Sequence, residues 1–386
     1  MTIEKKDEKK QYGNIEDYMA RRKDVTFADD PFNEVDSLVL CELLYADYRG
    51  IIPAEGSRRI DEVRRMFFAV HDREELEAED IFFAKSPLLL DPLSDGARFG
   101  ETCMGNYIKV FNDDQDMQIS AAVFMLEDGT AYVCYSGTDM TVSGWKEDFN
   151  FCYMKETEGQ RIAVQYLNQA AALTDRPLRV GGHSKGANFA VYASAFADPE
   201  VQDRIQVVYA NDGPGVNEDV VRTENYLRIV PKVVSIVPEE SIVGQILRHR
   251  YQDTVVKSSE RGIMQHDGFT WCVEGQRFVR TELSSRSRFF SEAQRVWLSN
   301  MDDEAREAFV TILFAPLEAT KMSSFEEMYE QRLIAAKRIL DSLTGMPREA
   351  HRAMRHFLEK LIRSCGIAAL ENKLSELEEK WNTDRT

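Results

Sequence analysis

The stretch from residue 179 to residue 190 reads Arg179-Val180-Gly181-Gly182-His183-Ser184-Lys185-Gly186-Ala187-Asn188-Phe189-Ala190. The apolar run 177–181 predicts a short strand, and the small apolar residues from Ala187 onward predict a helix packed closely on a sheet. Between them lies a Gly-x-Ser-x-Gly turn, which in this strand–turn–helix context predicts a nucleophile elbow. Gly182 and Gly186 remove side chains that would collide with neighbouring backbone, so the turn should lift the Ser184 hydroxyl out at the top of a sheet.

Strands and helices alternate on both sides of this turn. Two apolar runs, 118–126 and 131–135, are joined by a Glu-Asp-Gly-Thr turn and predict a hairpin. A helix is expected over 158–174, and further strands over 205–210 and 232–237. This alternation is typical of an α/β protein with a mostly parallel sheet covered by helices on both faces.

The 386 residues suffice for one large domain with an appendage. The polar residues 1–30 predict a flexible N-terminal arm, and residues 31–284 carry the alternating pattern. Residues 285–386 show helical spacing alone, which predicts an all-α C-terminal appendage. Its last two helices are expected over 347–363 and 366–381. The appendage could be a cap, a dimerisation surface or a docking bundle, and the sequence leaves these open.

Composition excludes several classes of function. The net charge of −18 argues against nucleic acid or an anionic membrane surface as a partner. No apolar run is long enough to span a bilayer, and the charged start 1–10 lacks the apolar core of a secretory signal, so a cytoplasmic protein is expected. The six cysteines are scattered without a Cys-x-x-Cys pattern, so no metal site and no cofactor are expected.

A serine nucleophile needs a general base, and histidine suits that role near neutral pH. The candidates are His71, His183, His249, His266, His351 and His356. Hydrolases with this elbow place the base after the serine, which disfavours His71. His183 must project away from the adjacent hydroxyl, two arginines flank His249, and the last two histidines lie on an Arg-rich helix. His266 remains, in the loop 262–271, which leads into an aromatic strand.

Two positions could supply the carboxylate that orients this base. Asp212 follows the strand 205–210 in a Gly-Pro-Gly turn that restricts its motion, and it is preferred. Glu239 and Glu240 follow the next strand and stay open as alternatives, since either arrangement suits a Ser-acid-His triad. A purely structural role for Asp212, bonding the amides of its own turn, also stays open.

Acyl transfer needs hydrogen-bond donors aimed at the developing oxyanion. One donor, the backbone N–H of Lys185, comes with the elbow. A second is expected from Thr138, in a loop predicted over 136–149. Trp145 and Phe149 of the same loop would either wall an apolar acyl pocket or serve as plain core aromatics.

Together these residues resemble the class 3 (fungal-type) lipase branch of the α/β-hydrolases. The likeness lies in the aromatic-x-Gly-Thr stretch followed by Trp and Asp (135–148), the Gly-His-Ser-x-Gly elbow (182–186) and the Gly-Pro turn after the next strand (213–214). It covers about residues 30–280 and looks nearest to a bacterial, cytoplasmic, lipase-like group. The elbow is common to many hydrolases, and its combination with the upstream Gly-Thr loop is more specific.

The resemblance implies an α/β-hydrolase fold in which Ser184 is the nucleophile and His266 the base, while Thr138 and the Lys185 amide form the oxyanion hole. The chain departs from the family at two positions. Ser136 replaces the usual Arg before the Gly-Thr pair, and Ser235 replaces the catalytic Asp that usually precedes Ile-Val-Pro. The second departure moves the expected acid to Asp212 or Glu240 and leaves a weakened or lost activity open.

The function predicted is that of a serine acyl hydrolase, esterase-like or lipase-like, acting on a soluble ester, thioester or lysophospholipid. Acyl transfer to an acceptor other than water would use the same machinery. The alternative is a non-catalytic binding or regulatory protein that keeps the hydrolase fold. In either case residues 285–386 could mediate a homo-oligomer or dock a protein partner.

Overall fold

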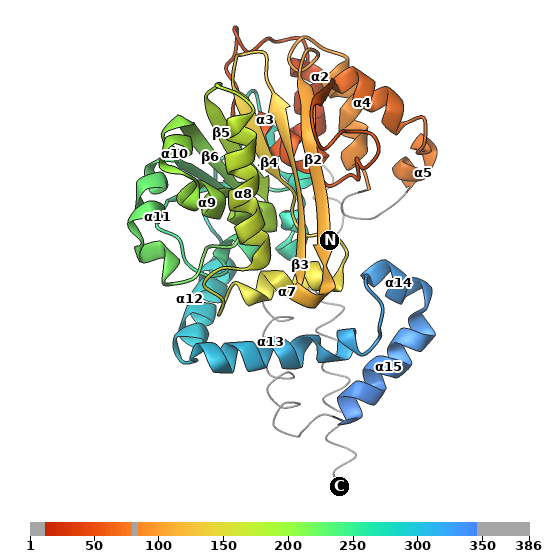
Figure 1. Cartoon of the computed structure of the whole chain (residues 1–386), viewed down its shortest axis with the longest axis vertical. Coiled ribbons are helices and arrows are strands. Elements are labelled where there is room, and N and C mark those ends of the chain that lie inside the picture. The colour runs from red at the N-terminus through yellow and green to blue at the C-terminus, as the bar shows by residue number, and fades with distance from the viewer. Residues whose placement is uncertain (1–11, 79–83, 346–386) are drawn as a thin grey trace, which may run out of the picture.

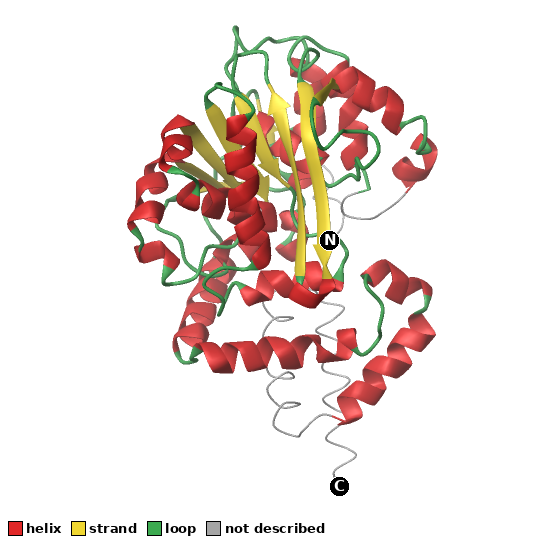
Figure 2. Ribbon diagram, viewed as in Figure 1, coloured by secondary structure: helices red, strands yellow, loops and turns green. Residues whose placement is uncertain are grey.

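An eight-stranded sheet lies at the centre of the computed structural model, which describes residues 12–78 and 84–345 (Figures 1 and 2). Its strands follow chain order: β1 (Ser57–Arg59), β2 (Cys103–Asn112), β3 (Met117–Met125), β4 (Ala131–Tyr135), β5 (Leu178–His183), β6 (Ile205–Asn211), β7 (Val233–Pro238) and β8 (Asp253–Val256). The first four strands pair antiparallel, including the predicted β3–β4 hairpin, and β4 to β8 pair parallel.

Helices cover both faces of the sheet, which confirms the predicted α/β-hydrolase fold (Figure 1). Those of the α/β part are α2 (Ile15–Arg22), α3 (Glu34–Leu43), α4 (Ile60–Phe67), α5 (Arg73–Ala78), α6 (Leu90–Ser94), α7 (Val142–Asn150), α8 (Glu158–Ala172), α9 (Lys185–Phe196), α10 (Pro199–Arg204) and α11 (Glu224–Ile229). Short two-residue strands β9 (Val273–Glu274) and β10 (Arg277–Phe278) form a separate hairpin.

Alternation along β4 explains the two layers. The Tyr132 hydroxyl lies 2.8 Å from Ser37 Oγ on α3, and Cys134 packs in the same apolar cluster. Val133 and Tyr135 point to the other face, where the Tyr135 hydroxyl donates to a carbonyl of α8 at 2.7 Å. A strand with apolar side chains on both faces must be covered on both, as parallel sheets are.

The N-terminal segment belongs to the core. On α2, Ile15, Tyr18 and Met19 are buried. The fully buried Arg98 grips Asp36 with two hydrogen bonds, of 2.7 and 2.5 Å, and also donates to backbone carbonyls of the segment 25–31. Residues 15–30 therefore pack against the body of the protein rather than extend as the flexible arm suggested by their polar composition; residues 1–11 lie outside the described part of the chain.

The predicted loop over 136–149 is wrong, because most of it forms the helix α7. Thr141 caps this helix: its Oγ1 accepts a hydrogen bond from the Gly144 amide at 3.2 Å. Asp139 in turn accepts from both the amide and the hydroxyl of Thr141. The capping threonine was the available sequence signal, and it was obscured by a glycine inside a short segment without clear periodicity.

The C-terminal part that the structure describes is all helical, as predicted. Its helices are α12 (Ser285–Ser299), α13 (Asp303–Glu318), α14 (Phe325–Glu330) and α15 (Arg332–Gly345), with α13 running alongside α7 (Figure 1). The helices expected over 347–363 and 366–381 lie outside the described residues. The division of the chain at residue 284 stays a prediction.

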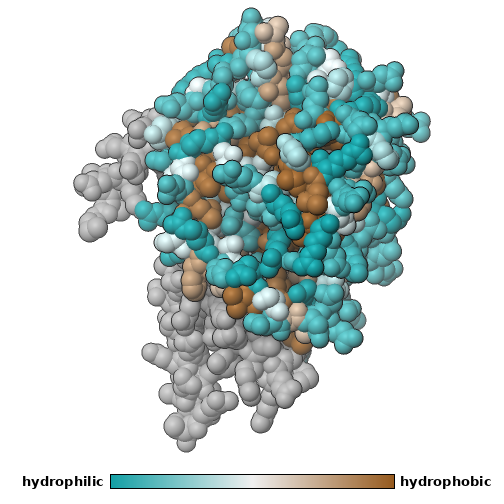
Figure 3. All heavy atoms as spheres, turned by 90° about the vertical axis from the view of Figure 1, so that its left-hand side faces the viewer, coloured by the Kyte–Doolittle hydropathy of each residue, from teal (hydrophilic) through white to brown (hydrophobic). Residues whose placement is uncertain are grey.

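The surface seen from the side of α10 and α11 is mostly hydrophilic, with smaller apolar patches between (Figure 3). Such a surface accords with the net charge of −18. Within the ranges 12–78 and 84–345, no helix combines the length and the apolarity needed to cross a bilayer.

Candidate active site

A tight turn at Ser184 joins β5 to α9. Ser184 stands between β5 and α9 with φ = 58° and ψ = −130°, a conformation that costs a non-glycine residue energy and persists only where its surroundings enforce it. A Cβ on Gly182 would collide with the backbone of Gly186, and a Cβ on Gly186 would collide with the Tyr135 carbonyl. The close approach of strand and helix thus requires glycine at both positions.

The imidazole of His266 contacts a carboxylate that follows β6, the strand next to β5. Its Nδ1 lies 2.6 Å from Oδ2 of Asp212, whose side chain is fully buried. The other carboxylate oxygen accepts from the Ser241 hydroxyl at 2.5 Å and from the Gly244 amide at 3.1 Å. A carboxylate held this way accepts the Nδ1 proton of the imidazole, which leaves Nε2 as the basic nitrogen.

The alternative acids have other partners. Glu240 accepts from the Gly262 amide at 2.5 Å, and its own amide donates to the side chain of Gln265 at 2.7 Å. Glu239 bonds through its backbone amide to the carbonyl of Val256 at 2.9 Å. Glu240 therefore braces the short 3₁₀ turn Gly262–His266 at its first residue, while Asp212 is the carboxylate that contacts the imidazole.

Ser235, at the position where the resembled lipases carry their acid, faces the next strand. Its hydroxyl donates to Asp253 of β8 at 2.7 Å. Asp212 directly follows the last residue of β6, and its amide donates to the Ile236 carbonyl of β7 at 2.8 Å. Asp212 therefore follows β6, one strand before the strand β7 that carries Ser235.

His183, the residue before Ser184, binds the loop that carries His266. Its Nε2 lies 2.8 Å from the His266 carbonyl, and its Nδ1 lies 2.6 Å from the Tyr45 hydroxyl. A carbonyl only accepts, so Nε2 carries the proton and Nδ1 accepts from the tyrosine. The two imidazoles stack with centroids 4.6 Å apart, and burial holds the pKa of His183 well below its usual value.

Tyr45 follows helix α3 and reaches the site from far upstream in the chain. A Cβ on Gly137 would collide with its hydroxyl, so the Gly-Thr loop also closes directly onto this tyrosine. No local pattern in the sequence distinguishes Tyr45 from the other aromatic residues of the core, and sequence reasoning missed it.

The two expected oxyanion donors are anchored by consecutive residues of α7. The Thr138 hydroxyl lies 2.5 Å from Oδ2 of Asp148, and burial raises the pKa of that carboxyl to about 6. Lys185 is the first residue of α9, so its amide belongs to the N-terminal group that lacks an intrahelical acceptor. Its fully buried side chain runs to Oε2 of Glu147, 3.3 Å from the ammonium.

Glu147 is a buried junction that sequence reasoning also missed. Besides Lys185, it accepts from the amide of Gln118 at 3.1 Å and from Thr157 Oγ1 and the Gly159 amide, both at 3.0 Å. A buried ion pair is tolerated when the remaining lone pairs find donors, and here both oxygens are satisfied. Glu147 therefore ties α7 to β3, to the start of α8 and to the residue after the nucleophile.

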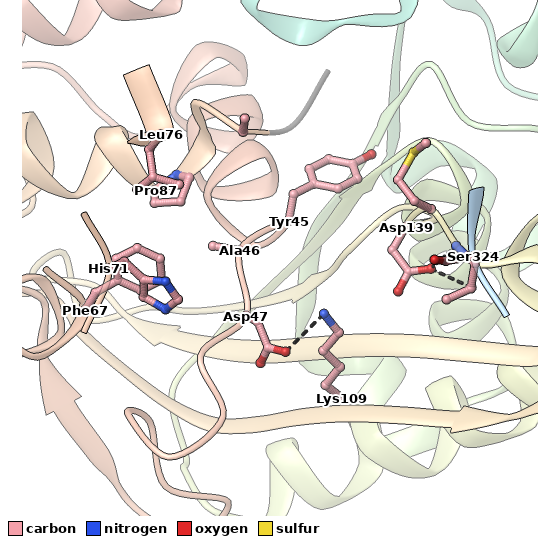
Figure 4. A pocket seen from close by; sticks show the side chains of 13 residues that line it. Tyr45, Ala46, Asp47, Phe67, His71, Leu76, Pro87, Lys109, Asp139 and Ser324 are labelled. Atoms are coloured by element: carbon pink, nitrogen blue, oxygen red, sulfur yellow. Dashed lines mark hydrogen bonds and ion pairs between the residues drawn. The ribbon is translucent and has the colours of Figure 1, made fainter. Parts of the chain in front are cut away.

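A hollow of about 310 Å³ adjoins the Gly-Thr loop (Figure 4). Tyr45 and Met140 line it together with Phe67 and Leu76, which contribute apolar surface. The Lys109 ammonium at its rim pairs with a carboxylate at 3.3 Å. Ser184, His266 and Asp212 are not among the residues that line this hollow.

The aromatics expected to wall an acyl pocket are placed elsewhere. Trp145 is 44% exposed, and Phe149 packs edge-on against Phe314 of α13 with ring centroids 5.3 Å apart. Neither lines the hollow, so Phe149 is a core aromatic, the plainer of the two alternatives.

The histidines set aside by sequence are accounted for as far as the structure describes them. His71 stacks on Phe67 at 4.2 Å and lines the hollow. His249 lies in a loop, 3.4 Å from Asp253 and stacked on Tyr251. His351 and His356 lie outside the described residues. Over the described ranges, no group of three or more His, Cys, Asp or Glu side chains could hold a metal ion.

The sheet topology and the serine elbow define a protein of the α/β-hydrolase fold. The chain belongs to the Mbeg1-like family, whose model matches residues 93–315, more than half of its length. Among curated proteins none matches it.

Solved structures that are similar to part of the chain include two lipases. One is the native propeptide complex of the Rhizomucor miehei lipase, with 16% identity and a TM-score of 0.32 over 43% of this chain and 58% of the lipase chain. The other is the M37 lipase, with 14% identity and a TM-score of 0.35 over 56% of this chain and 70% of that chain. The chain thus matches less than two thirds of the Rhizomucor miehei protein.

Proposed function

We propose that the protein is a serine acyl hydrolase that cleaves an ester or thioester of an apolar acyl group. The observation that carries this proposal is the 2.6 Å contact between His266 Nδ1 and Asp212, in a loop bonded to the residue next to Ser184. The Asp212 contact engages Nδ1 and leaves Nε2 as the nitrogen that would accept the serine proton, and Ser184 directly follows His183, the residue that binds the His266 carbonyl. Asp212 rather than Glu239 or Glu240 is the proposed acid.

In the proposed reaction Ser184 Oγ attacks the acyl carbonyl carbon while its proton passes to His266 Nε2. The oxyanion accepts hydrogen bonds from the backbone amides of Lys185 and Thr138, because the Thr138 hydroxyl already donates to Asp148. When the carbon–oxygen or carbon–sulfur bond breaks, the leaving alcohol or thiol takes the proton from Nε2. Water then attacks the acyl-serine, gives its proton to the same nitrogen and releases the acid, and the serine regains its proton. Asp212 keeps the imidazole oriented and stabilises its cationic form.

The hollow beside the Gly-Thr loop supports an apolar group of moderate size as part of the substrate. Met140, two residues after Thr138, forms its wall, so a group bound there would lie close to the proposed oxyanion site. A soluble ester, a thioester or a lysophospholipid fits this description.

The direct test is covalent labelling with a fluorophosphonate probe, together with hydrolysis of p-nitrophenyl esters. Wild type should label at Ser184 and turn over, and Ser184→Ala should lose labelling and at least about a thousandfold in kcat. Ser194→Ala is the matched control, because Ser194 is a buried serine of the same helix α9. Turnover of Ser184→Ala at the wild-type rate would refute the proposal.

The second candidate is a non-catalytic protein that keeps the hydrolase fold and docks a partner through its C-terminal helices. It is favoured by the exposure of large apolar side chains there: Tyr329 is 74% exposed and Leu333 is 84% exposed. Folded wild-type protein that takes no probe, yet forms a complex that needs residues 285–386, would support it.

A further inference from the structure

We infer that α13 and the segment after it position the two oxyanion donors, acting through α7. This inference rests on the proposed function, and it gives the C-terminal helices a role within the same molecule. The Gly-Thr loop and the start of α9 are far apart in the sequence, and α7 touches both.

The inner side of α7 binds the side chains of the two residues that carry the proposed donors. Asp148 accepts from the Thr138 hydroxyl, and the preceding residue, Glu147, binds the ammonium of Lys185. A shift of α7 would therefore move the side-chain anchors of both residues at once, and with them the backbone amides that they present. In a site that works by fixed dipoles, displacement by about 1 Å can cost on the order of 100-fold in rate.

The outer side of α7 is held by the C-terminal helices at its first turn. The Val142 amide donates to the Ser323 carbonyl at 2.9 Å, and Thr141 forms a β-bridge with Ser324. Val142 is buried in an apolar cluster together with Phe309 and Phe314 of α13. The chain after α13 thus adds a strand-like contact to the segment that follows Thr138.

Two further contacts hold the rest of α7. The Phe149 ring packs on Phe314, and the Lys146 ammonium bonds Glu318 at 2.5 Å and Asp116 at 3.0 Å. A helix of nine residues has little stability of its own, so contacts of this kind determine where it lies. Every one of these contacts except that with Asp116 comes from residues beyond 300.

The test compares Phe314→Ala with Phe99→Ala. Phe99 is an equally buried phenylalanine that packs edge-on against Phe27 on the other face of the sheet. The kcat per active site, counted by titration with the probe, should fall about 10- to 100-fold in Phe314→Ala with KM within about threefold. Phe99→Ala should keep the wild-type kcat, and Phe314→Leu should recover most of the loss.

A second pair of variants, each removing one charge, tests the same inference if Phe314→Ala does not fold. Glu318→Gln removes the charge that binds Lys146, and Glu292→Gln breaks a comparable exposed pair with Arg295 on α12, away from α7. A loss of a few-fold in kcat is expected for the first variant alone. Equal kcat values within both pairs would overturn the inference.

Amide hydrogen exchange separates this inference from the proposed function. Exchange over residues 138–150 should quicken in Phe314→Ala and stay unchanged in Phe99→Ala, whether or not the wild type turns over an ester. Unchanged exchange in Phe314→Ala contradicts the positioning role. Absence of Ser184-dependent turnover in wild type contradicts the proposed function alone.

Discussion

At the scale of residues, the position of Asp212 follows from its turn. Its φ of 42° lies in the left-handed region, which aspartate tolerates better than most residues. The turn lets the amide bond β7 while the carboxylate reaches His266. Turn chemistry and chain order select this pair from the sequence. Tyr45 and Glu147 were not selected, because their importance comes from partners distant in the chain.

Replacing Asp212 by Asn should remove the acceptor that fixes the imidazole tautomer. We expect kcat to fall on the order of 10³- to 10⁴-fold, with folding intact. Glu240→Gln keeps an oxygen for the Gly262 amide and should stay within a few-fold of wild type. Steady-state hydrolysis of a p-nitrophenyl ester measures both variants, and the reverse ranking would return the role of the acid to Glu240.

Asp148 should make stability depend on pH. Its folded-state pKa of about 6 lies above the ordinary 3.8, so the folded chain binds this proton more tightly than the unfolded chain. Its contribution to the free energy of unfolding is therefore full below about pH 4 and is lost as pH rises to about 6. Relative to wild type, Asp148→Asn should gain about 3 kcal/mol between these limits, measured by urea unfolding. A gain that does not vary with pH would contradict this origin.

At the scale of elements, length and periodicity decided what could be predicted. The helix expected over 158–174 is observed as α8, whose capping box pairs Thr157 with Gln160. By contrast, α7 has nine residues with Gly144 inside, and tertiary contacts rather than propensity stabilise it. Helix α7, which binds the side chains of Thr138 and Lys185, was thus the element that could not be predicted from the sequence.

The hollow between α4, α5 and the Gly-Thr loop should select among acyl chains. Leu76→Trp adds volume to its wall from α5, where the side chain is only half-buried. We expect kcat/KM for octanoate esters to fall about tenfold or more while acetate esters keep theirs. Leu173→Trp is the control, because Leu173 follows the last residue of α8 and its side chain is 60% exposed. An unchanged chain-length profile would mean that the substrate lies elsewhere.

At the scale of the whole molecule, the N-terminal segment supplies part of the helical layer that packs on the sheet. It covers one face through α2 and α3, and Arg98 fixes it with a buried ion pair to Asp36. Polar composition suggested a flexible arm, because only three residues of α2 are buried. The burial of this segment depends on Arg98, 62 positions after Asp36, which local composition does not reveal.

Removing Asp36 should therefore destabilise the entire protein. Asp36→Ala leaves the guanidinium of Arg98 buried without its carboxylate, which typically costs about 3–5 kcal/mol. Asp95→Ala breaks an exposed pair with Lys23 and should cost less than about 1 kcal/mol. Denaturant unfolding of the two variants gives the comparison. Equal losses would show that the buried pair contributes no more than a surface pair.

The β-bridge between Thr141 and Ser324 has a consequence during synthesis. The residues of the proposed site leave the ribosome at widely separated times, in the order Tyr45, Ser184 and His266. Ser324, which forms the β-bridge, emerges after all three, so the site cannot have this contact before then. A nascent polypeptide would lack this contact until residue 324 had been made. The proposed oxyanion site would therefore be supported only after the segment that follows α13 had emerged.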